Sequence, residues 1–266
     1  MSEAIEIQRD WITTCEAAAR AGARELLQWR GRFSAREKAP ADLVTEADVA
    51  AQEAVRRLIA ARFPDHAFLG EETATAPIAH GDHLIWIVDP LDGTTNYVHG
   101  YPQFAVSVAL ARGGDVLVGV IYDPVGDECF LAVRHEGAWC NGQQLSTSSI
   151  ANICDALAAV SLPARVRSDS PDLLNFIEAA QSCQAVRRTG SAALNLAYVA
   201  RGWFDAFWAT QIHPWDVAAG VLLIREAGGI VTARNGEDFD LWRPAFLSAA
   251  NPELHAELLK LLTPYP

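Results

Sequence analysis

The sequence has little of what several large classes of protein require. Positive charge is scarce, because 21 Lys and Arg face 33 Asp and Glu, a formal net charge of −12. Binding to a nucleic-acid backbone depends on excess positive charge, so we expect no direct nucleic-acid contact. No apolar run approaches the roughly 18 residues of a membrane span, so we expect no membrane partner. The N-terminus lacks the basic and apolar regions of a secretory signal, which predicts a cytoplasmic protein.

Paired cysteines and paired histidines are also missing. The five cysteines are odd in number, widely spaced and without a CxxC pair, and the seven histidines show no HxxxH or HxH spacing. Disulfide frameworks and zinc sites depend on such spacing, so we expect reduced thiols and no zinc. What remains is ordinary globular composition, half hydrophobic and one fifth charged, over a length that can bury a large core.

The first half of the chain predicts two helices followed by strands. Apolar residues at helical spacing predict a helix over 4–29, and a second helix after Thr45, where Thr45-Glu46-Ala47-Asp48 has the form of a capping box. Strands are expected at residues 67–69, 83–88, 104–111, 116–122 and 128–133. Turn-rich segments separate the last three, which predicts an antiparallel meander, and Asn141-Gly142 marks a further hairpin.

The second half alternates between strands and helices. Strands are expected at residues 156–162, 185–188, 204–209, 230–232 and 246–249. Helices are expected at residues 170–181, 191–201, 214–227 and 252–262. Helices interleaved with sheets predict an α/β fold of stacked layers. We treat residues 1–266 as a single domain, with subdomains of about 1–150 and 151–266 as the alternative.

The segment from Trp86 to Tyr97 carries the chemistry. Asp89 closes an apolar strand, and Pro90 keeps it extended, so a turn after Pro90 would bring Asp89 and Asp92 together. Two such carboxylates repel each other unless a proton or a cation lies between them, and Mg²⁺ accepts oxygen ligands of this kind. Gly93-Thr94-Thr95 allows backbone N–H groups to approach an anion. Metal ligands beside an anion cradle are what metal-assisted phosphoryl hydrolysis requires.

The same residues also have an ordinary structural reading. Asp, Pro, Gly and Thr are turn residues in any protein, and composition alone gives a plain turn roughly even odds. The preceding apolar strand favours the functional reading, because two bare carboxylates would be costly at its end.

At this point the sequence resembles a known family. The run from Asp89 to Tyr97 looks like the signature of the inositol monophosphatase family of Mg²⁺-dependent, lithium-sensitive phosphatases. Three further blocks are similar to that family in order and spacing: Asp42–Asp48, Gly70-Glu71-Glu72, and Trp215–Gly220 together with Glu226–Gly229. The resemblance implies a sugar-phosphatase fold of alternating αβαβα layers, a homodimer, and a small phosphate monoester as substrate.

The resemblance also implies metal ligands. Glu71, Asp89 and the carbonyl oxygen of Leu91 would hold a first Mg²⁺, whose bound water attacks. Asp89, Asp92 and Asp216 would hold a second Mg²⁺, which stabilises the leaving oxygen. Two to three ions are implied in all, and they would offset part of the negative charge where a phosphate binds.

The remaining roles also follow from the resemblance. Asp48 would act with Glu71 in orienting or binding a third ion, and Thr94 would hydrogen-bond the attacking water, so Glu71, Thr94 and Asp48 are the catalytic set. The predicted substrate contacts are Gly93, Thr94, Thr95, Gly190, Ser191, Ala192 and Asp216. Asp48 and Asp216 also have a structural alternative, since both stand in the first turn of an expected helix. His213 is expected to be structural, because the metal-bound water needs no histidine.

The sequence departs from the family at one substrate position. Ala209 stands where members that hydrolyse inositol phosphates commonly carry a Glu that contacts a hydroxyl, so Thr210 or Gln211 would have to replace it. Trp208 is expected to lie beside the site and to favour a ring. Inositol-1-phosphate remains the leading substrate, with 3′,5′-bisphosphate nucleotidase, histidinol-phosphate phosphatase and fructose-1,6-bisphosphatase activities as alternatives. A hypothesis from another class is a regulatory partner in transcription or RNA metabolism.

Overall fold

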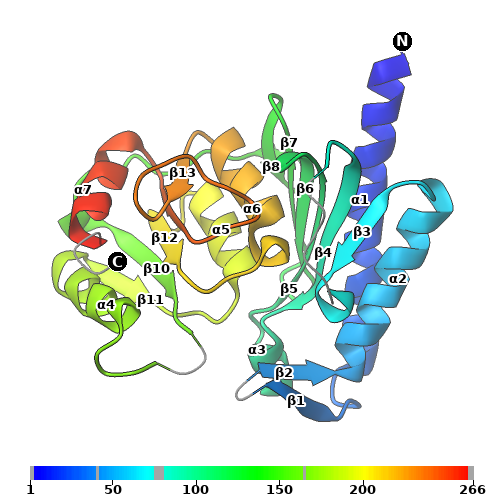
Figure 1. The fold of residues 1–266 in the computed structure, drawn as a ribbon, viewed down its shortest axis with the longest axis horizontal. Coiled ribbons are helices and arrows are strands. Elements are labelled where there is room, and N and C mark those ends of the chain that lie inside the picture. Colours follow the sequence, from blue (N-terminus) through cyan, green and yellow to red (C-terminus); the bar gives the residue numbers. More distant parts are fainter. Residues whose placement is uncertain (1–2, 40–41, 75–80, 164–165, 263–266) are drawn as a thin grey trace.

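The computed structural model describes residues 3–39, 42–74, 81–163 and 166–262, and its elements stack in five layers (Figure 1). From one side to the other, the layers are two helices, a sheet, two helices, a second sheet and two helices. The predicted α/β fold of alternating layers is therefore confirmed. Within the described ranges, every helix falls short of the length or the apolar character needed to cross a bilayer.

The first sheet has seven strands in the order β3-β4-β5-β6-β7-β8-β9. Its strands are β3 (Ala67–Gly70), β4 (Leu84–Asp92), β5 (Ala105–Arg112), β6 (Asp115–Asp123), β7 (Glu128–Val133), β8 (Gly137–Cys140) and β9 (Gln143–Gln144). β3 runs parallel to β4 and the other pairings are antiparallel, so the predicted meander and the hairpin at Asn141-Gly142 are confirmed. Helices α1 (Glu3–Trp29) and α2 (Glu46–Arg62) cover its outer face.

The second sheet has five strands in the order β11-β10-β12-β14-β13. Its strands are β10 (Leu157–Ser161), β11 (Ala185–Arg187), β12 (Ala206–Ala209), β13 (Ile230–Ala233) and β14 (Phe246–Ala249). Helices α5 (Ala192–Ala200) and α6 (Pro214–Glu226) lie between the two sheets, and α4 (Pro171–Ser182) and α7 (Pro252–Leu262) cover the far side. Short helices complete the described chain: α3 (Thr94–Val98) and the 3₁₀ turns η1 (Glu71–Thr73) and η2 (Ile153–Asp155).

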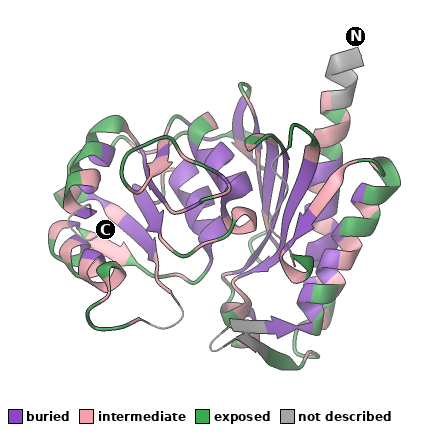
Figure 2. Ribbon diagram, in the orientation of Figure 1, coloured by how far each residue is buried: buried purple, intermediate pink, exposed green. Residues whose placement is uncertain are grey.

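Three apolar clusters separate these layers. One joins α1 and α2 to the first sheet, the largest fills the space around α5 and α6, and the third joins the second sheet to α4 and α7. Figure 2 shows the buried residues concentrated in the sheets and the central helices. All nine residues of α5 are buried, so its polar groups must find partners inside the protein.

The first residues of two helices are determined by neighbouring side chains that cap them. Thr45 caps α2, and Asp48 completes the capping box, as the sequence predicts. Ser170 caps α4 with proline at the first helical position. A short antiparallel pair, β1 (Ala35–Ala39) and β2 (Asp42–Thr45), was not predicted, because its alanine and charged residues have low strand propensity.

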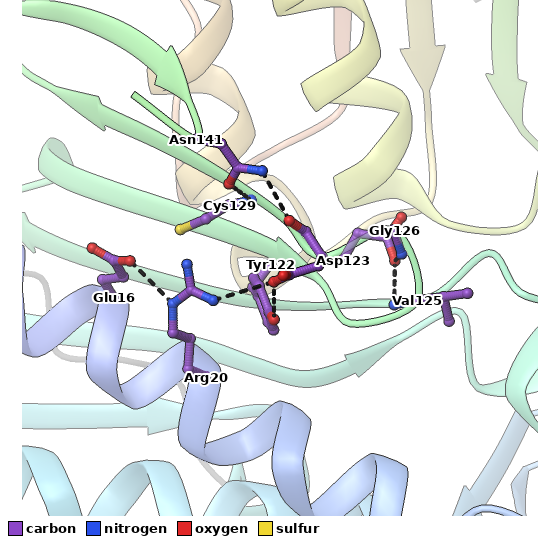
Figure 3. A network of polar contacts seen from close by, with 9 residues as sticks. Glu16, Arg20, Tyr122, Asp123, Val125, Gly126, Cys129 and Asn141 are labelled. Carbon is purple, nitrogen blue, oxygen red and sulfur yellow. Dashed lines mark hydrogen bonds and ion pairs between the residues drawn. The ribbon is translucent and has the colours of Figure 1, made fainter. Parts of the chain in front are cut away.

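A polar network fastens α1 to the turn between β6 and β7 (Figure 3). The Arg20 guanidinium lies 4.5 Å from the centre of the Tyr122 ring and donates to Glu16 at 3.0 Å and to Asp127 at 3.5 Å. Asp123 closes the same turn, because its Oδ1 accepts the N–H of the residue two positions on at 2.8 Å. This network is structural and sets the position of α1 against the sheet.

Candidate active site

A bulge in β4 brings two carboxylates to the same place. Asp89 pairs with Ser107 of β5 but Asp92 pairs with Ala105, so two residues of β4 between these pairs oppose a single residue of β5. The extra residue reverses the alternation of side chains, and Pro90 lies inside this bulge, where a missing N–H is tolerated. The prediction that the strand ends at Asp89 and that the chain turns after Pro90 is therefore wrong, since β4 continues to Asp92. Both carboxylates are buried, with 2% and 7% exposure.

The first turn of α6 supplies a third carboxylate. The ligand oxygens of Asp89, Asp92 and Asp216 all lie within 4.8 Å of one another. Asp216 also accepts the backbone N–H of His213 at 2.8 Å, so the structural alternative expected for Asp216 is compatible with membership of this cluster. The His213 ring stacks on Trp215, with 4.6 Å between centroids, in keeping with a structural role.

Burial and mutual repulsion make this cluster unfavourable without a cation. Burial raises the pKa of Asp89 well above its usual range, and repulsion from Glu71, Asp92 and Asp216 raises it further. The pKa of Asp216 is raised in the same way, by burial and then by Asp92 and Glu71. Burial raises the pKa of Asp92 to about 6. A set of oxygen donors with this excess of negative charge fits hard divalent cations.

Glu71 reaches this cluster from a neighbouring strand. β3 runs parallel to β4, and Gly70 at its end pairs with Val88, so Glu71 follows directly beside the end of the buried strand. Its effect on the pKa values of Asp89 and Asp216 shows that its carboxylate acts on both. The structure thus brings Asp89, Asp92 and Asp216 together, with the Glu71 carboxylate close enough to raise the pKa values of Asp89 and Asp216.

The start of α5 fixes the orientation of Asp92. Its carboxylate accepts the Ser191 hydroxyl and the backbone N–H groups of Ala192 at 3.1 Å and Ala193 at 2.9 Å. These bonds favour the charged form and oppose the effect of burial on the pKa of Asp92. The family resemblance predicts that Ser191 contacts the substrate. In the structure, Ser191 is fully buried and its hydroxyl donates to Asp92.

Thr94 connects the end of β4 to α2. Its hydroxyl lies 3.1 Å from the carbonyl oxygen of Leu91 and 3.4 Å from Oδ1 of Asp48. The other oxygen of Asp48 accepts both the hydroxyl and the N–H of Thr45, so its capping role is real and leaves one oxygen directed towards Thr94. Burial raises the pKa of Asp48, and the carboxylate that adds to this effect is Glu72. The N–H of Leu91 donates to Asp89 at 2.9 Å.

Two glycines allow the loops around the site to approach one another. Gly93 has φ = +94°, and a Cβ there would lie 2.8 Å from the carbonyl oxygen of Gln103. Gly190 has φ = +89°, and a Cβ there would lie 2.8 Å from Oδ1 of Asn96. The Asn96 amide donates to the carbonyls of Gln103 and Thr189 at 2.7 and 2.9 Å, which holds the 189–190 loop against α3. Both positions therefore require glycine.

A cavity of about 390 Å³ opens beside Asp92 and Asp216. Four residues in its wall were predicted as substrate contacts, namely Thr95, Gly190, Ala192 and Asp216. Four polar residues of the wall were missed, namely Asn96, Ser161, Arg188 and Thr189. The sequence offered a signal for one of them, because Arg187-Arg188 places two positive charges directly before the predicted substrate block of an acidic chain.

The residues around Ala209 contradict one expectation. Trp208 is 1% exposed and packs in the third apolar cluster, so the expectation that it lies beside the site and stacks on a ring is wrong. Ala209 is fully buried within β12. Of the two residues expected to replace the missing acid, Thr210 donates its hydroxyl to Asp172 at 2.5 Å, and Gln211 lines the cavity.

Comparison with known proteins gives a consistent result. The sequence profile described as the inositol monophosphatase family matches residues 7–265. The inositol-1-monophosphatase of Caulobacter vibrioides is 37% identical over 251 residues, which cover 92% of this chain and 98% of that protein. The Nus factor SuhB of Pseudomonas aeruginosa is 38% identical over 238 residues, which cover 88% and 87% of the two chains.

Solved structures share the fold. The extragenic suppressor protein suhB from Bartonella henselae matches with a TM-score of 0.87 and 36% identity, over 94% of this chain and 97% of that one. An IMPase/NADP phosphatase complexed with Mg²⁺ and phosphate matches with a TM-score of 0.81 and 27% identity, over 91% and 90% of the two chains.

Proposed function

This chain belongs to the inositol monophosphatase family and is a phosphoric monoester hydrolase, and on this premise we propose that it hydrolyses inositol-1-phosphate or a similar small phosphorylated polyol with Mg²⁺. The observation that carries the proposal is the group of three carboxylates whose oxygens lie within 4.8 Å, at the edge of a cavity of about 390 Å³. A phosphate in that cavity would meet the cations that the carboxylates hold.

The proposed metal ligands come from the resemblance to the family, and the cluster of three carboxylates supports them. We assign Glu71, Asp89 and the Leu91 carbonyl to one Mg²⁺, and Asp89, Asp92 and Asp216 to a second, so that Asp89 is shared. Bound there, Mg²⁺ supplies Lewis-acid stabilisation of the phosphoryl and leaving oxygens and makes a bound water more acidic. A third ion at Asp48 with Glu71 stays a prediction, as does the use of Gly93, Thr95 and Asp216 as phosphate contacts.

Thr94 and Asp48 are placed to handle the proton of the attacking water. The Thr94 hydroxyl oxygen can accept a hydrogen bond from that water while it donates its own proton to one of two acceptors, the Leu91 carbonyl oxygen at 3.1 Å or Oδ1 of Asp48 at 3.4 Å. Burial raises the pKa of Asp48, so this carboxylate holds a proton more readily than an exposed one does. Thr45 fixes the orientation of Asp48 from the other side.

The cavity wall favours a hydroxyl-bearing or anionic substrate. Gln211 provides an amide near the position of the missing acid, and Arg188 adds a positive charge to the wall. A positive charge there disfavours the cationic amine of histidinol phosphate. Inositol-1-phosphate therefore stays the first candidate, followed by 3′,5′-bisphosphate nucleotides and fructose 1,6-bisphosphate.

Phosphate release across a substrate panel tests the proposal. The panel contains inositol-1-phosphate, histidinol phosphate, 3′-phosphoadenosine 5′-phosphate and fructose 1,6-bisphosphate, each with Mg²⁺ and with a chelator. We expect Mg²⁺-dependent turnover that is greatest for inositol-1-phosphate. Turnover that continues unchanged in the chelator would refute the metal assignment, and a clear preference for another compound would replace the substrate.

A second candidate function rests on relatives that bear the name Nus factor SuhB. It is a regulatory partner role exerted through protein contacts, because the net charge of −12 disfavours direct binding to nucleic acid. Pull-down of a partner that survives Asp89→Asn would support this role beside catalysis, and loss of the partner together with the metal would assign it to the active site. A homodimer is part of the main proposal, and light scattering of the intact chain tests it.

A further inference from the structure

A second cavity, of about 640 Å³, lies on the other side of the residues that follow β12. Its walls come from the first turn of α4, from the segment between β13 and β14, and from Leu262 at the end of α7 (Figure 1). Gln211 lines both this cavity and the cavity beside Asp216. We call it the Arg234 cavity, after the residue described next. Its volume falls within the range of small-molecule sites.

One buried N–H group of Arg234 has no hydrogen-bond acceptor among the described residues. Its Nη2 donates to the carbonyl oxygen of Leu262 at 3.1 Å, but its Nε is buried and has no hydrogen-bond partner among the described residues. Burial lowers the pKa of the guanidinium, and Asp172 opposes this only in part. Leaving a buried N–H without an acceptor is unfavourable, so an acceptor at this point would be stabilising.

A second arginine lines the same cavity. Arg243 is exposed and forms no ion pair within the described part of the chain. Two acids also line the cavity: Asp172, which accepts the Thr210 hydroxyl at 2.5 Å, and Glu237, which accepts the Asn235 amide at 2.8 Å. Neither acid forms an ion pair with either arginine within the described residues, so the Arg243 guanidinium and the Nε of Arg234 can still bind a ligand.

A purely structural role explains only part of this arrangement. Arg234 could serve simply to satisfy the carbonyl of Leu262 at the end of α7. That role accounts for one of its N–H groups, but not for the buried Nε or for Arg243 on the same cavity. The rest of the wall includes apolar residues, namely Pro171, Ala233, Ala245 and Leu262. The combination matches a ligand with an anionic head and an apolar body.

We propose that the Arg234 cavity binds an organic anion, a carboxylate or phosphate on an apolar body, through Arg234 and Arg243. The site is separate from the metal ligands, and only Gln211 is common to the two cavities. Such an anion can come from two sources. It is either the distal end of a substrate whose reacting phosphate lies at the metals or a separate small molecule.

Calorimetric titration of the full chain with 1-naphthoate tests binding directly. The titration is done in chelator, so its result does not depend on the proposed phosphatase activity. We expect one site per chain, and at least tenfold weaker binding in Arg243→Ala and in Arg234→Lys, which keeps the charge but loses the Nε donor. The neutral 1-naphthylmethanol should bind more weakly than the acid. Arg57→Ala, on the exposed face of α2, is the matched control and should leave the affinity unchanged.

Equal affinity in the parent and in Arg243→Ala would overturn the proposal, as would equal binding of the acid and the alcohol. Steady-state kinetics then distinguishes the two sources of the anion. If it is part of the substrate, 1-naphthoate competes with 3′-phosphoadenosine 5′-phosphate but not with inositol-1-phosphate, and Arg243→Ala raises KM for the former alone. If it is a separate ligand, 1-naphthoate changes kcat for both substrates, and Arg243→Ala removes this effect.

Discussion

Asp89→Asn should change the stability of this protein in opposite directions with and without Mg²⁺. In chelator, the variant removes a buried negative charge that three other carboxylates repel. The Asn side-chain oxygen can still accept the N–H of Leu91, which lies 2.9 Å from Oδ1 of Asp89, and its amide can donate to a neighbouring carboxylate. We therefore expect the metal-free variant to be more stable than the parent.

The size of this increase in stability can be estimated from the neighbouring Asp92. Its pKa rises from 3.8 to about 6. At about 1.4 kcal/mol per pKa unit, this corresponds to a cost of about 3 kcal/mol at neutral pH. Asp89 lacks the three donors that stabilise the Asp92 carboxylate, so its replacement should raise the stability by at least as much. In a chain of this size, about 3 kcal/mol raises Tm by roughly 6–12 °C.

With Mg²⁺ the expected result reverses. Mg²⁺ at about 100 times its Kd should stabilise the parent by about 2.7 kcal/mol, whereas the variant has lost the ligand shared by both ions and should show little stabilisation and no turnover. Thermal unfolding with chelator and with Mg²⁺ measures both effects. Asp123→Asn, at the buried turn between β6 and β7 (Figure 3), is the control, because Asp123 is not one of the three clustered carboxylates, and it should respond to Mg²⁺ as the parent does. A metal-free variant no more stable than the parent, or an undiminished Mg²⁺ response, would refute the reasoning.

Three further predictions concern the same site. Thr94→Val should lower kcat by about 10²-fold or more while leaving the Mg²⁺-induced rise in Tm intact, because the hydroxyl orients water; a parallel loss of Mg²⁺ response would make it a metal-site residue instead. Lithium should inhibit phosphate release at Mg²⁺ concentrations that support turnover, and full insensitivity would contradict the family expectation. In chelator, the free energy of unfolding should rise as the pH falls from 7 to 5, because Asp92 has a pKa of about 6 when folded and protonation removes its cost; urea unfolding that showed lower stability at pH 5 would contradict this.

The predictable parts of the fold are those with a local physical cause. The capping residues Thr45 and Ser170 locate the starts of α2 and α4 from a few adjacent side chains. The hairpin at Asn141-Gly142 is equally local, since both residues adopt positive φ. Periodicity located the other long helices, because each buries one face against a sheet.

The errors have causes that lie outside the local sequence. The extension of β4 through Pro90 depends on pairing with β5, which no short segment reveals. Trp208 is buried because helices cover both faces of its sheet, so all four residues of β12 are inside. In the site, Asp89 and Asp92 were predictable from their pattern, and Glu71 and Asp216 only from the resemblance to the family. The role of Ser191 follows from the approach of α5 to Asp92, about 100 residues away in the chain.

The division of the site between two sheets has a consequence for how such proteins diversify. Glu71, Asp89 and Asp92 come from strands of the first sheet or the turns at their ends, whereas Arg188 and Gln211 come from the segments that follow β11 and β12 of the second. Substitutions at Arg188 or Gln211 can therefore change the cavity wall without disturbing the carboxylates that the first sheet supplies.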